Sequence, residues 1–419
     1  MGHPLPWALF AVALLAAPQV LGSGLAVTLM SQMGIAIILC LSYNILLGQG
    51  GMLSFGHAVY SGLGGFAAIH VLNLLSREAP AMPVSLVPLV GGLAGMGFAA
   101  LSGFVITRMS GNTFGMITLG LGELVFAAAL MFPGFSGGEA GVSANRVVGP
   151  AVLGISFGPA IQVYYLIAAY TLVSALLMYA FTQTPLGRLL NAVRDNPERV
   201  AFIGYDPHWV RYLAFVIAGF FAGIAGGLGA LNFEIVQAEA LGAVRSGAYL
   251  LFTFIGGASY FFGPIAGGVL MVLASVLLSE MTRAWLLYLG LLFVLMVMYV
   301  PGGLASLVMV NLQLARRGRL RGLLPGYAAL LAAGTGALVG AAALIELLYH
   351  RQLNPAVGTP LRFLGLVLDS ASPSSWLGAA LVLVCAGLSV AAVRRRLLRQ
   401  WATLRVEIER DGAQPGRAP

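Results

Sequence analysis

The stretch LSYNILLGQGGMLSFGHAVYSGLGG, residues 41–65, sets the architecture of the chain. It joins two apolar runs, 25–47 and 52–73, each of them long enough for a membrane-spanning helix, which needs about 20 residues. Glycine lets the backbone leave helical geometry, so Gly50, Gly51 and Gly56 predict a helix break between the runs. Such a break is tolerated inside a membrane only where protein or water covers the backbone.

The composition of the whole chain indicates a membrane protein. Of its 419 residues, 59% are hydrophobic and 9% are charged, whereas an ordinary soluble protein has about 25% charged residues. This excludes a soluble enzyme, a disordered protein and a nucleic-acid binder. A membrane β-barrel is excluded because its strands alternate apolar and polar residues, and this chain runs in long apolar blocks. The predicted fold class is an all-α polytopic membrane protein.

We predict about 10–12 transmembrane or re-entrant helices, arranged as two repeated halves plus a C-terminal helical hairpin. The repeat rests on an echo of the glycines at 50–56, which return about 200 residues later as a second predicted helix break. The second break contains Gly256, Gly257, Gly263 and Pro264. The predicted segments are 5–22, 25–47, 52–73, 86–107, 113–133, 162–182, 211–231, 247–262, 264–280, 285–308, 325–349 and 376–393.

The distribution of arginine predicts the orientation in the membrane. All 22 basic residues are arginine, and many of them gather in the connection 184–210, in the cluster 316–321 and at 394–396. Cytoplasmic loops carry such an excess, so these segments and both termini are predicted to be cytoplasmic. The resulting division is a membrane core at 1–310, a cytoplasmic Arg-rich linker at 311–324, an additional transmembrane hairpin at 325–393 and a cytoplasmic tail at 394–419.

Several activities are excluded by missing chemistry. The chain has no lysine, so it cannot form the Walker A phosphate loop of an ATPase. Cys40 and Cys385 lie far apart and the five histidines are scattered, so neither a disulfide nor a metal site is expected. We find no cluster of catalytic residues, which predicts no enzyme activity and no cofactor. The net charge of +8 reflects membrane orientation rather than nucleic-acid binding.

The connection TPLGRLLNAVRDNPERVAFIGYD at 184–206 predicts two short helices outside the membrane. Pro185 suits the first position of a helix, and residues 196–197 break that helix before a second one begins. The apolar face of the first helix consists of Leu186, Leu189, Leu190 and Val193. Arg188, Arg194 and Asp195 lie off this face. An amphipathic pair of this kind either docks on a soluble partner or lies on the lipid surface.

Polar side chains inside the predicted spans are candidates for a translocation path, because they are costly in lipid. These candidates are Asn44, Ser54, His57 and Glu123. The alternative is a structural role, in which the first three bond to backbone groups freed by the helix break and Glu123 pairs with a neighbouring helix.

Four segments, in the right order, resemble the permeases of branched-chain amino acid ABC transporters. Residues 41–65 resemble the early signature of the family, 254–268 its late signature and 184–206 its ATPase-coupling loop. Residues 111–123 together with 137–142 resemble its central stretch and indicate the M-type membrane subunit. The coupling loop keeps Glu198 and Gly204 of the Glu-Ala-Ala-x-x-x-Gly pattern, but both alanines are replaced and Ala201 comes one position late.

The resemblance implies a permease subunit of an ATP-driven importer that forms the translocation path for branched-chain or related amino acids. Its partners would be a second permease subunit, two cytoplasmic P-loop ATPase subunits and a periplasmic substrate-binding protein, in the cytoplasmic (inner) membrane of a bacterium. The ATPase-coupling residues would be Arg188, Arg194, Asp195, Glu198, Ala201 and Gly204. The alternative is an ion-coupled secondary transporter of a small organic solute, with Glu123 as the candidate ion ligand.

Overall fold

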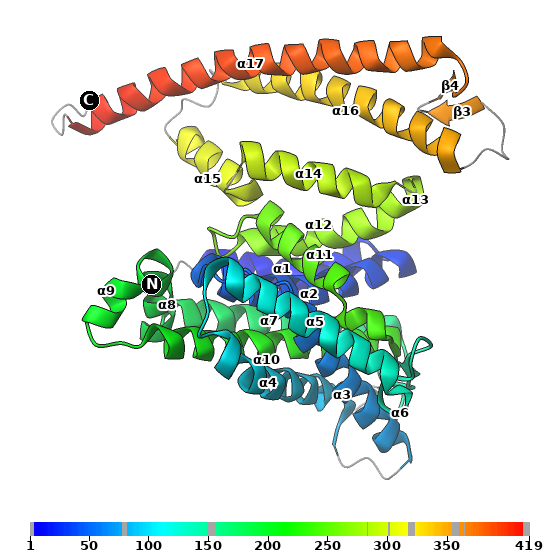
Figure 1. Cartoon of the computed structure of the whole chain (residues 1–419), viewed down its shortest axis with the longest axis vertical. Helices are drawn as coiled ribbons and strands as arrows, with labels where there is room; N and C mark the ends of the chain where they lie inside the picture. Colours follow the sequence, from blue (N-terminus) through cyan, green and yellow to red (C-terminus); the bar gives the residue numbers. More distant parts are fainter. Residues whose placement is uncertain are drawn as a thin grey trace. The chain divides into compact units, whose positions relative to one another are not determined.

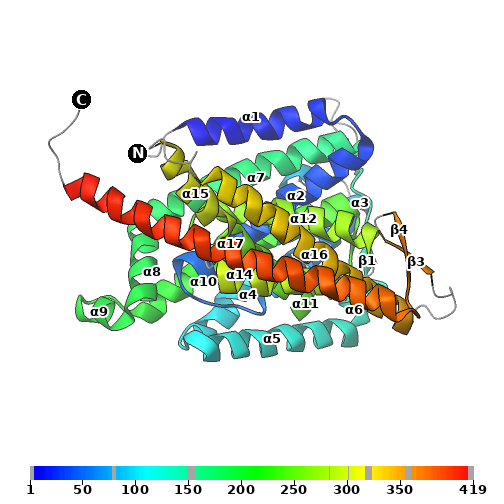
Figure 2. The ribbon, with the colours of Figure 1, turned by 90° about the horizontal axis from the view of Figure 1, so that it is seen from above.

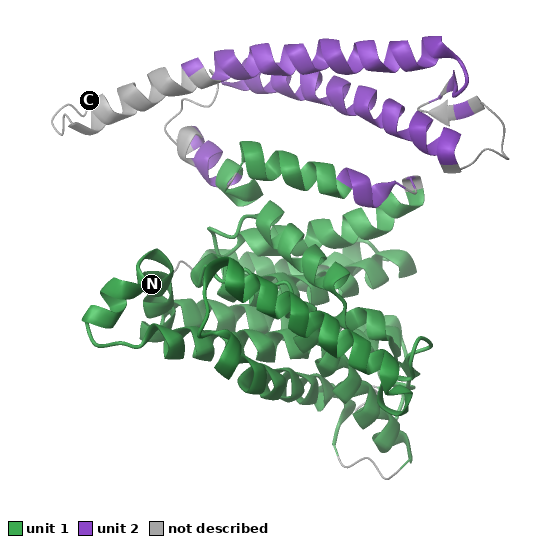
Figure 3. Ribbon diagram, viewed as in Figure 1, with its two compact units in different colours: residues 1–281, 289–307 green, residues 282–288, 308–419 purple. Residues whose placement is uncertain are grey.

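The computed structural model describes residues 4–77, 82–148, 156–282, 284–300, 302–316, 323–353, 360–363 and 365–413. The chain divides into two compact units, which we describe separately (Figure 3). The first comprises Met1–Met281 and Leu289–Leu307, and the second comprises Thr282–Tyr288 and Val308–Pro419.

Helices make up almost all of the first unit (Figure 1). In chain order its elements are α1 (Pro4–Val20), α2 (Gly24–Asn44), the π-helical turn η1 (Ile45–Gln49), α3 (His57–Arg77), the 3₁₀ turn η2 (Val84–Leu86), α4 (Val87–Ile106), α5 (Gly111–Met131), α6 (Pro133–Ser136), β1 (Val142–Ser143), α7 (Ala160–Gln183), α8 (Pro185–Asp195), α9 (Pro197–Phe202), α10 (Pro207–Phe233), β2 (Ile235–Val236), the 3₁₀ turn η3 (Ala238–Leu241), α11 (Ala243–Gly256), α12 (Gly263–Leu273), the π-helical turn η4 (Ala274–Leu278) and α13 (Ser279–Met281). Helices α14 (Trp285–Tyr299) and α15 (Gly303–Arg316) contribute residues to both units.

Eight helices in the described ranges are long and apolar enough to cross a membrane. They are Gly24–Gln49, His57–Arg77, Val84–Ile106, Gly111–Met131, Ala160–Gln183, Pro207–Phe233, Leu324–Gln352 and Pro373–Leu397. Shorter apolar helices lie at three further predicted segments, over Leu5–Val20, Ala243–Gly256 and Gly263–Leu278. The predicted all-α polytopic membrane fold is therefore confirmed.

One predicted span has a different form. The segment 285–308 is not a single helix, because α14 and α15 meet at a bend of 49°. Gly303 has a φ of 67°, a left-handed conformation that glycine adopts at little cost and that a continuous α-helix cannot contain. The glycine after a short apolar run was the signal in the sequence for this bend.

Glycine lets α3, α4 and α10 pack with their backbones in contact. A Cβ atom added at Gly223 of α10 would meet the backbone of Gly91 and Gly92 on α4, and one added at Gly64 of α3 would meet the backbone of Gly223. Because lipid provides no hydrophobic drive between helices, such close packing is what holds membrane helices together. The same faces include Gly95, Gly219 and Gly227.

Helices α1 and α5 lie on opposite sides of the first unit (Figure 2). Several large apolar side chains of α5 point away from the protein, among them Met116, which is 74% exposed, and Leu124, which is 66% exposed. An apolar exposed surface of this kind suits contact with lipid chains rather than with water.

The second unit contains a hairpin of two long helices, α16 (Leu324–Leu353) and α17 (Pro373–Ala413). The strands β3 (Pro360–Phe363) and β4 (Leu366–Asp369) follow α16 and precede α17 in the chain, and they pair antiparallel. Gly340 of α16 lies against the backbone of Leu383 of α17, and Glu346 accepts hydrogen bonds from the hydroxyl groups of Thr282 (2.5 Å) and Tyr288 (3.2 Å). Residues 317–322 of the predicted linker and 414–419 of the predicted tail lie outside the described residues.

The glycine contact predicts a difference between two alanine substitutions. Gly223→Ala places a Cβ atom against the backbone of α4, where no flexible side chain can move aside, so it is expected to destabilise the fold by about 1–3 kcal/mol. Gly97→Ala on the exposed side of α4 meets no atom within 4 Å and is expected to be neutral or slightly stabilising. Thermal unfolding in detergent measures both, and equal unfolding temperatures would contradict the packing argument.

Candidate functional site

The connection 184–206 folds as the two helices that its sequence predicts, α8 and α9. The Thr184 hydroxyl caps α8 by accepting from the Gly187 N–H at 3.2 Å, and the Asn196 side chain caps α9 by accepting from the Arg199 N–H at 2.9 Å. On the predicted apolar face, Leu190 is fully buried in the main core of the first unit. The apolar face of α8 therefore packs on the protein's own core, and not on lipid or on a partner.

A second apolar surface of this connection is left uncovered in the chain. Phe202 is 90% exposed and Ile203 is 64% exposed, and Tyr205 beside them is also exposed. The predicted coupling residues belong to the same connection and are also exposed: Arg188, Arg194, Asp195, Glu198, Ala201 and Gly204. An exposed Phe–Ile pair beside charged side chains fits a protein-docking surface, whose apolar centre and polar rim it resembles.

Helix α8 is bonded to the end of α2 through side chains. Arg194 donates from Nη1 to the carbonyl oxygen of Gly48, and Asn191 donates from Nδ2 to Oε1 of Gln49 at 2.9 Å. Both acceptors belong to the π-helical turn η1, which closes α2. The alkyl stem of Arg194 also covers Gly51, where an added Cβ atom would lie 2.7 Å from the Arg194 Cγ. The amphipathic connection and the helix break are therefore one structural element.

The non-helical segment between η1 and α3 is held from three other helices. The Tyr43 hydroxyl of α2 donates to the carbonyl of Ser54 at 2.7 Å, and the Thr118 hydroxyl of α5 accepts from the N–H of Phe55 at 3.0 Å. The Ser246 hydroxyl of α11 accepts from the N–H of Ala58 at 2.9 Å. These bonds satisfy backbone groups that the break removes from helical pairing, as a buried break requires.

His57, at the start of α3, is fully buried and has one free nitrogen. Its Nε2 lies 2.9 Å from the Ser42 hydroxyl, and that hydroxyl donates its single proton to the carbonyl of Ala218 at 2.7 Å. The His57 Nε2 must therefore be the donor to Ser42, which makes Nδ1 an acceptor. Among the described atoms Nδ1 has no partner, and neither do the buried Asn44 Oδ1 and Ser54 Oγ.

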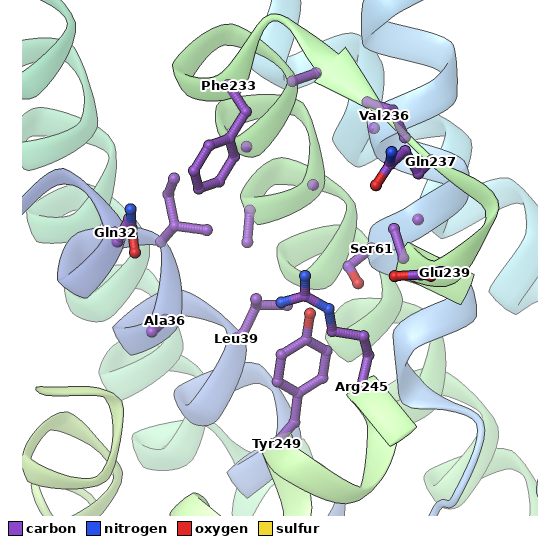
Figure 4. A pocket seen from close by; sticks show the side chains of 18 of the residues that line it. Gln32, Ala36, Leu39, Ser61, Phe233, Val236, Gln237, Glu239, Arg245 and Tyr249 are labelled. Atoms are coloured by element: carbon purple, nitrogen blue, oxygen red, sulfur yellow. The ribbon is translucent and has the colours of Figure 1, made fainter. Parts of the chain in front are cut away.

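A cavity of about 340 Å³ opens in the first unit, at the opposite end of α10 from α8 and α9. It lies between the middle of α2, one face of α3, the C-terminal half of α10, the segment 235–240, the start of α11 and the α12–η4 junction. Figure 4 shows the guanidinium of Arg245 and the hydroxyl of Tyr249 pointing toward one another, with Glu239 and Ser61 on the same side. Leu39 and Phe233 are among the apolar residues of the lining.

The segment 235–240, at the edge of this cavity, pairs with the loop that contains β1 and Arg146. Strand β1 pairs with β2, and Val142 lies opposite Val236. Arg146 donates through its guanidinium to the carbonyls of Leu231 and Asn232 at the C-terminal end of α10, while its own N–H donates to the carboxylate of Glu234 at 2.9 Å. A cation at this end satisfies carbonyls that have no helical partner and complements the helix dipole.

The structure brings three of the four predicted path residues together and separates the fourth. Asn44, Ser54 and His57 are all buried at or beside the helix break. Glu123 is exposed on α5, and none of the four lines the cavity. Within the described ranges, no group of three or more His, Cys, Asp or Glu side chains could hold a metal ion.

Sequence reasoning missed the polar side of the cavity. Arg245 lies just before the predicted segment 247–262, so the sequence does not mark it as a charged residue inside the membrane. A lone cation at the start of an apolar helix was the available signal. Tyr249 and Ser61 gave no signal, because single hydroxyl groups are common in packed membrane helices.

Comparison with known proteins agrees with this architecture. The family described as "Branched-chain amino acid transport system / permease component" matches residues 25–301. The high-affinity branched-chain amino acid transport system permease protein LivM of Salmonella typhimurium is 29% identical over 314 residues, which cover 69% of this chain and 71% of that protein. LivM of Escherichia coli is 28% identical over 306 residues, which cover 67% of this chain and 70% of that protein. No solved structure matches. Since the match covers the larger part of the chain, the protein belongs to the family of permease components of branched-chain amino acid transport systems.

Proposed function

We propose that this chain is the membrane-spanning permease subunit of an ATP-driven importer and forms the translocation path for branched-chain or related amino acids. The observation that carries the proposal is the hydrogen-bonded connection between the exposed helix pair α8–α9 and the broken end of α2. Family membership supports it, as does the missing lysine, since a chain without a Walker A lysine needs a separate ATPase.

The proposed partners complete an ATP-driven importer. Two P-loop ATPase subunits would dock in the cytoplasm, one of them on the exposed surface of Phe202 and Ile203. A second permease subunit would complete the path, and a periplasmic substrate-binding protein would deliver the amino acid to the opposite end. The arginines of α8 and α9 support a cytoplasmic position for this connection, because cytoplasmic loops carry an excess of basic residues. We assign the chain to the inner membrane of a bacterium, with both termini in the cytoplasm.

The mechanism is transmission through η1. When the ATPase subunits close on ATP, the docked α8 moves, and its hydrogen bonds from Arg194 and Asn191 draw η1 with it. A π-helical turn is a wide, weakly bonded form of helix that is frequent at functional sites, so it is a suitable place for α2 to change direction. The residues Asn44, Ser54 and His57 change their surroundings in this step, which gives their unpaired polar atoms partners in the second state.

The predicted division of the chain fits this assignment. The family match at 25–301 falls inside the proposed permease core at 1–310, and the hairpin of α16 and α17 lies beyond it. We assign the transport step to the core and a packing role to the hairpin. An ion-coupled secondary transporter is disfavoured, because Glu123, its candidate ion ligand, is exposed on α5 and lies outside the cavity.

The first test identifies the partners. The tagged chain, extracted from its native membrane in mild detergent, is expected to carry along a second permease and P-loop ATPases, as identified by mass spectrometry. Proteoliposomes that contain this complex and the binding protein are expected to take up leucine only with ATP inside. Recovery of the chain alone, together with uptake driven by an ion gradient, would contradict the proposal.

A second prediction concerns coupling. Arg194→Gln removes the hydrogen bond to Gly48, so leucine uptake is expected to fall by about 10-fold or more while ATP hydrolysis by the assembled complex continues. Arg108→Gln, at another exposed arginine on the predicted cytoplasmic side, is the matched control and should leave both rates unchanged. Equal loss of hydrolysis and uptake in Arg194→Gln would indicate failed assembly rather than failed coupling.

A third prediction concerns docking. Gly204 has a φ of 92°, and a Cβ atom added there meets nothing within 4 Å, so Gly204→Ala acts through backbone strain alone. A strain of about 1–2 kcal/mol in the docked conformation lowers the affinity for the ATPase by about 5-fold to 30-fold. Gly120→Ala, also in open space but without a positive φ, is the control. Binding of the purified ATPase to the variants measures both, and unchanged affinity in Gly204→Ala would contradict a docking role for this turn.

A further inference from the structure

The cavity between α2, α3, α10 and α11 holds both signs of charge in an otherwise largely apolar lining. Arg245 belongs to the first turn of α11, and Glu239 belongs to η3, six residues earlier in the chain. Both line the cavity, and Figure 4 shows the guanidinium reaching into it. Neither side chain forms an ion pair with a described residue. The salt bridge found among the described residues joins Arg194 and Asp195, which lie outside the cavity.

The position of Arg245 is not explained by the stability of its own helix. The N-terminal turn of a helix carries a partial positive charge, so a cation there is unfavourable, whereas a cation in the last turn is favourable. An arginine placed against the dipole, and pointing into a cavity, is better explained by an anionic group that enters from outside the chain. Arginine suits a carboxylate in particular, because its planar fork can donate two parallel hydrogen bonds.

We propose that this cavity binds a zwitterionic aliphatic α-amino acid on its way through the permease. Arg245 holds the α-carboxylate, Glu239 accepts from the α-ammonium, and the side chain lies on the apolar residues of α2, α10 and α12. The inference rests on the proposed function and adds to it the site at which this subunit contacts its substrate.

The apolar side of the cavity fits a branched aliphatic side chain. It is lined by residues that include Ile35, Leu39, Ala225, Met271 and Val272. These side chains offer no hydrogen bond, so they favour a hydrocarbon group over a hydroxyl or an amide. The volume of about 340 Å³ falls at the lower end of the range of ligand sites, about 300–1,000 Å³, as expected for a single amino acid.

The two charges together select for a net-neutral ligand with separated charges. A ligand with only one charged group would lose the charge-assisted hydrogen bond to either Arg245 or Glu239. A neutral sugar or a hydrocarbon would leave both unpaired. Tyr249, on the same side as the charges, supplies a hydroxyl group that can donate to the carboxylate.

The cavity is also placed where transport can act on it. Its α2 wall, at 32–39, lies on the same helix that ends in η1 and is bonded to α8. Its opposite wall is built by Ser61, Gly62 and Gly65 of α3 and by Gly226 and Gly229 of α10, which belong to the closely packed glycine contact or lie beside it. A movement of α2 against this wall changes the cavity without opening the packed helices.

The test compares three ligands on the purified transporter complex, without the binding protein, by titration calorimetry. L-leucine carries both charges, 3-methylbutylamine lacks the carboxylate and 4-methylpentanoate lacks the ammonium group. The wild-type complex is expected to bind leucine about 10-fold to 100-fold more tightly than either analogue, because each loses a charged hydrogen bond. Arg245→Gln should bind leucine and 3-methylbutylamine equally, and Glu239→Gln should bind leucine and 4-methylpentanoate equally.

Matched controls come from the same end of the unit. Arg77→Gln and Glu139→Gln change exposed charges outside the cavity and should keep the wild-type ratios. If Arg245 or Glu239 had a structural role, its substitution would weaken the binding of all three ligands alike. With a binding role, the substitution removes one ligand preference only, because the charged group missing from the analogue and the charge removed from the side chain belong to one interaction. Arg245→Lys should restore part of the preference for leucine over 3-methylbutylamine.

Two results would overturn the inference and leave the proposed function standing. The first is ATP-driven leucine uptake by a complex whose wild-type form binds no leucine without the binding protein, or whose Arg245→Gln and Glu239→Gln variants keep the wild-type ligand preferences. The second is unchanged leucine binding in the Arg245→Gln and Glu239→Gln variants, combined with a loss of the stimulation of ATP hydrolysis by the binding protein. This result would assign the cavity to docking of the binding protein. Failure of the wild-type complex to import leucine under ATP would instead count against the proposed function.

Discussion

The hydrogen bond from Arg194 to the carbonyl of Gly48 is the interaction on which the coupling geometry depends. A helix that ends leaves carbonyl groups without partners, and next to a membrane no abundant water supplies them. Here the partner comes from α8, a helix outside the row of spanning helices. Displacement of α8 would remove this partner from the buried carbonyl of Gly48, a cost that a movement of α2 relieves.

The first unit contains two kinds of helix contact, which are close backbone packing through glycine and hydrogen bonds from side chains at the end of α2. Helices α3, α4 and α10 touch backbone to backbone through glycine, and no side chain there can take up a new rotamer. Helix α2 instead ends in a π-helical turn, and hydrogen bonds with the hydroxyl groups of Tyr43, Thr118 and Ser246 hold the segment that follows. Bistable hydrogen-bonded segments beside rigid helices are a common basis for switching between states.

The sequence predicted the parts of the fold that depend on local patterns. The spacing of Leu186, Leu190 and Val193 predicted the apolar face of α8, which the structure packs on the core, since this pattern reports one helix surface. The side on which Glu123 lies could not be predicted, because α5 is apolar on all sides and has no preferred face. The cavity escaped prediction since its walls come from segments more than 200 residues apart, Gln32 and Ser275 among them.

The packing of Arg194 over Gly51 has a consequence for the evolution of the protein. Gly51 has a φ of 63°, and any side chain there would collide with the alkyl stem of Arg194. A substitution at either position thus changes what the other can tolerate, although positions 51 and 194 lie far apart in the sequence. In orthologous sequences the two positions should vary as a pair or not at all, and a subunit that exchanged only its cytoplasmic connection with a distant relative would inherit a mismatch at the helix break.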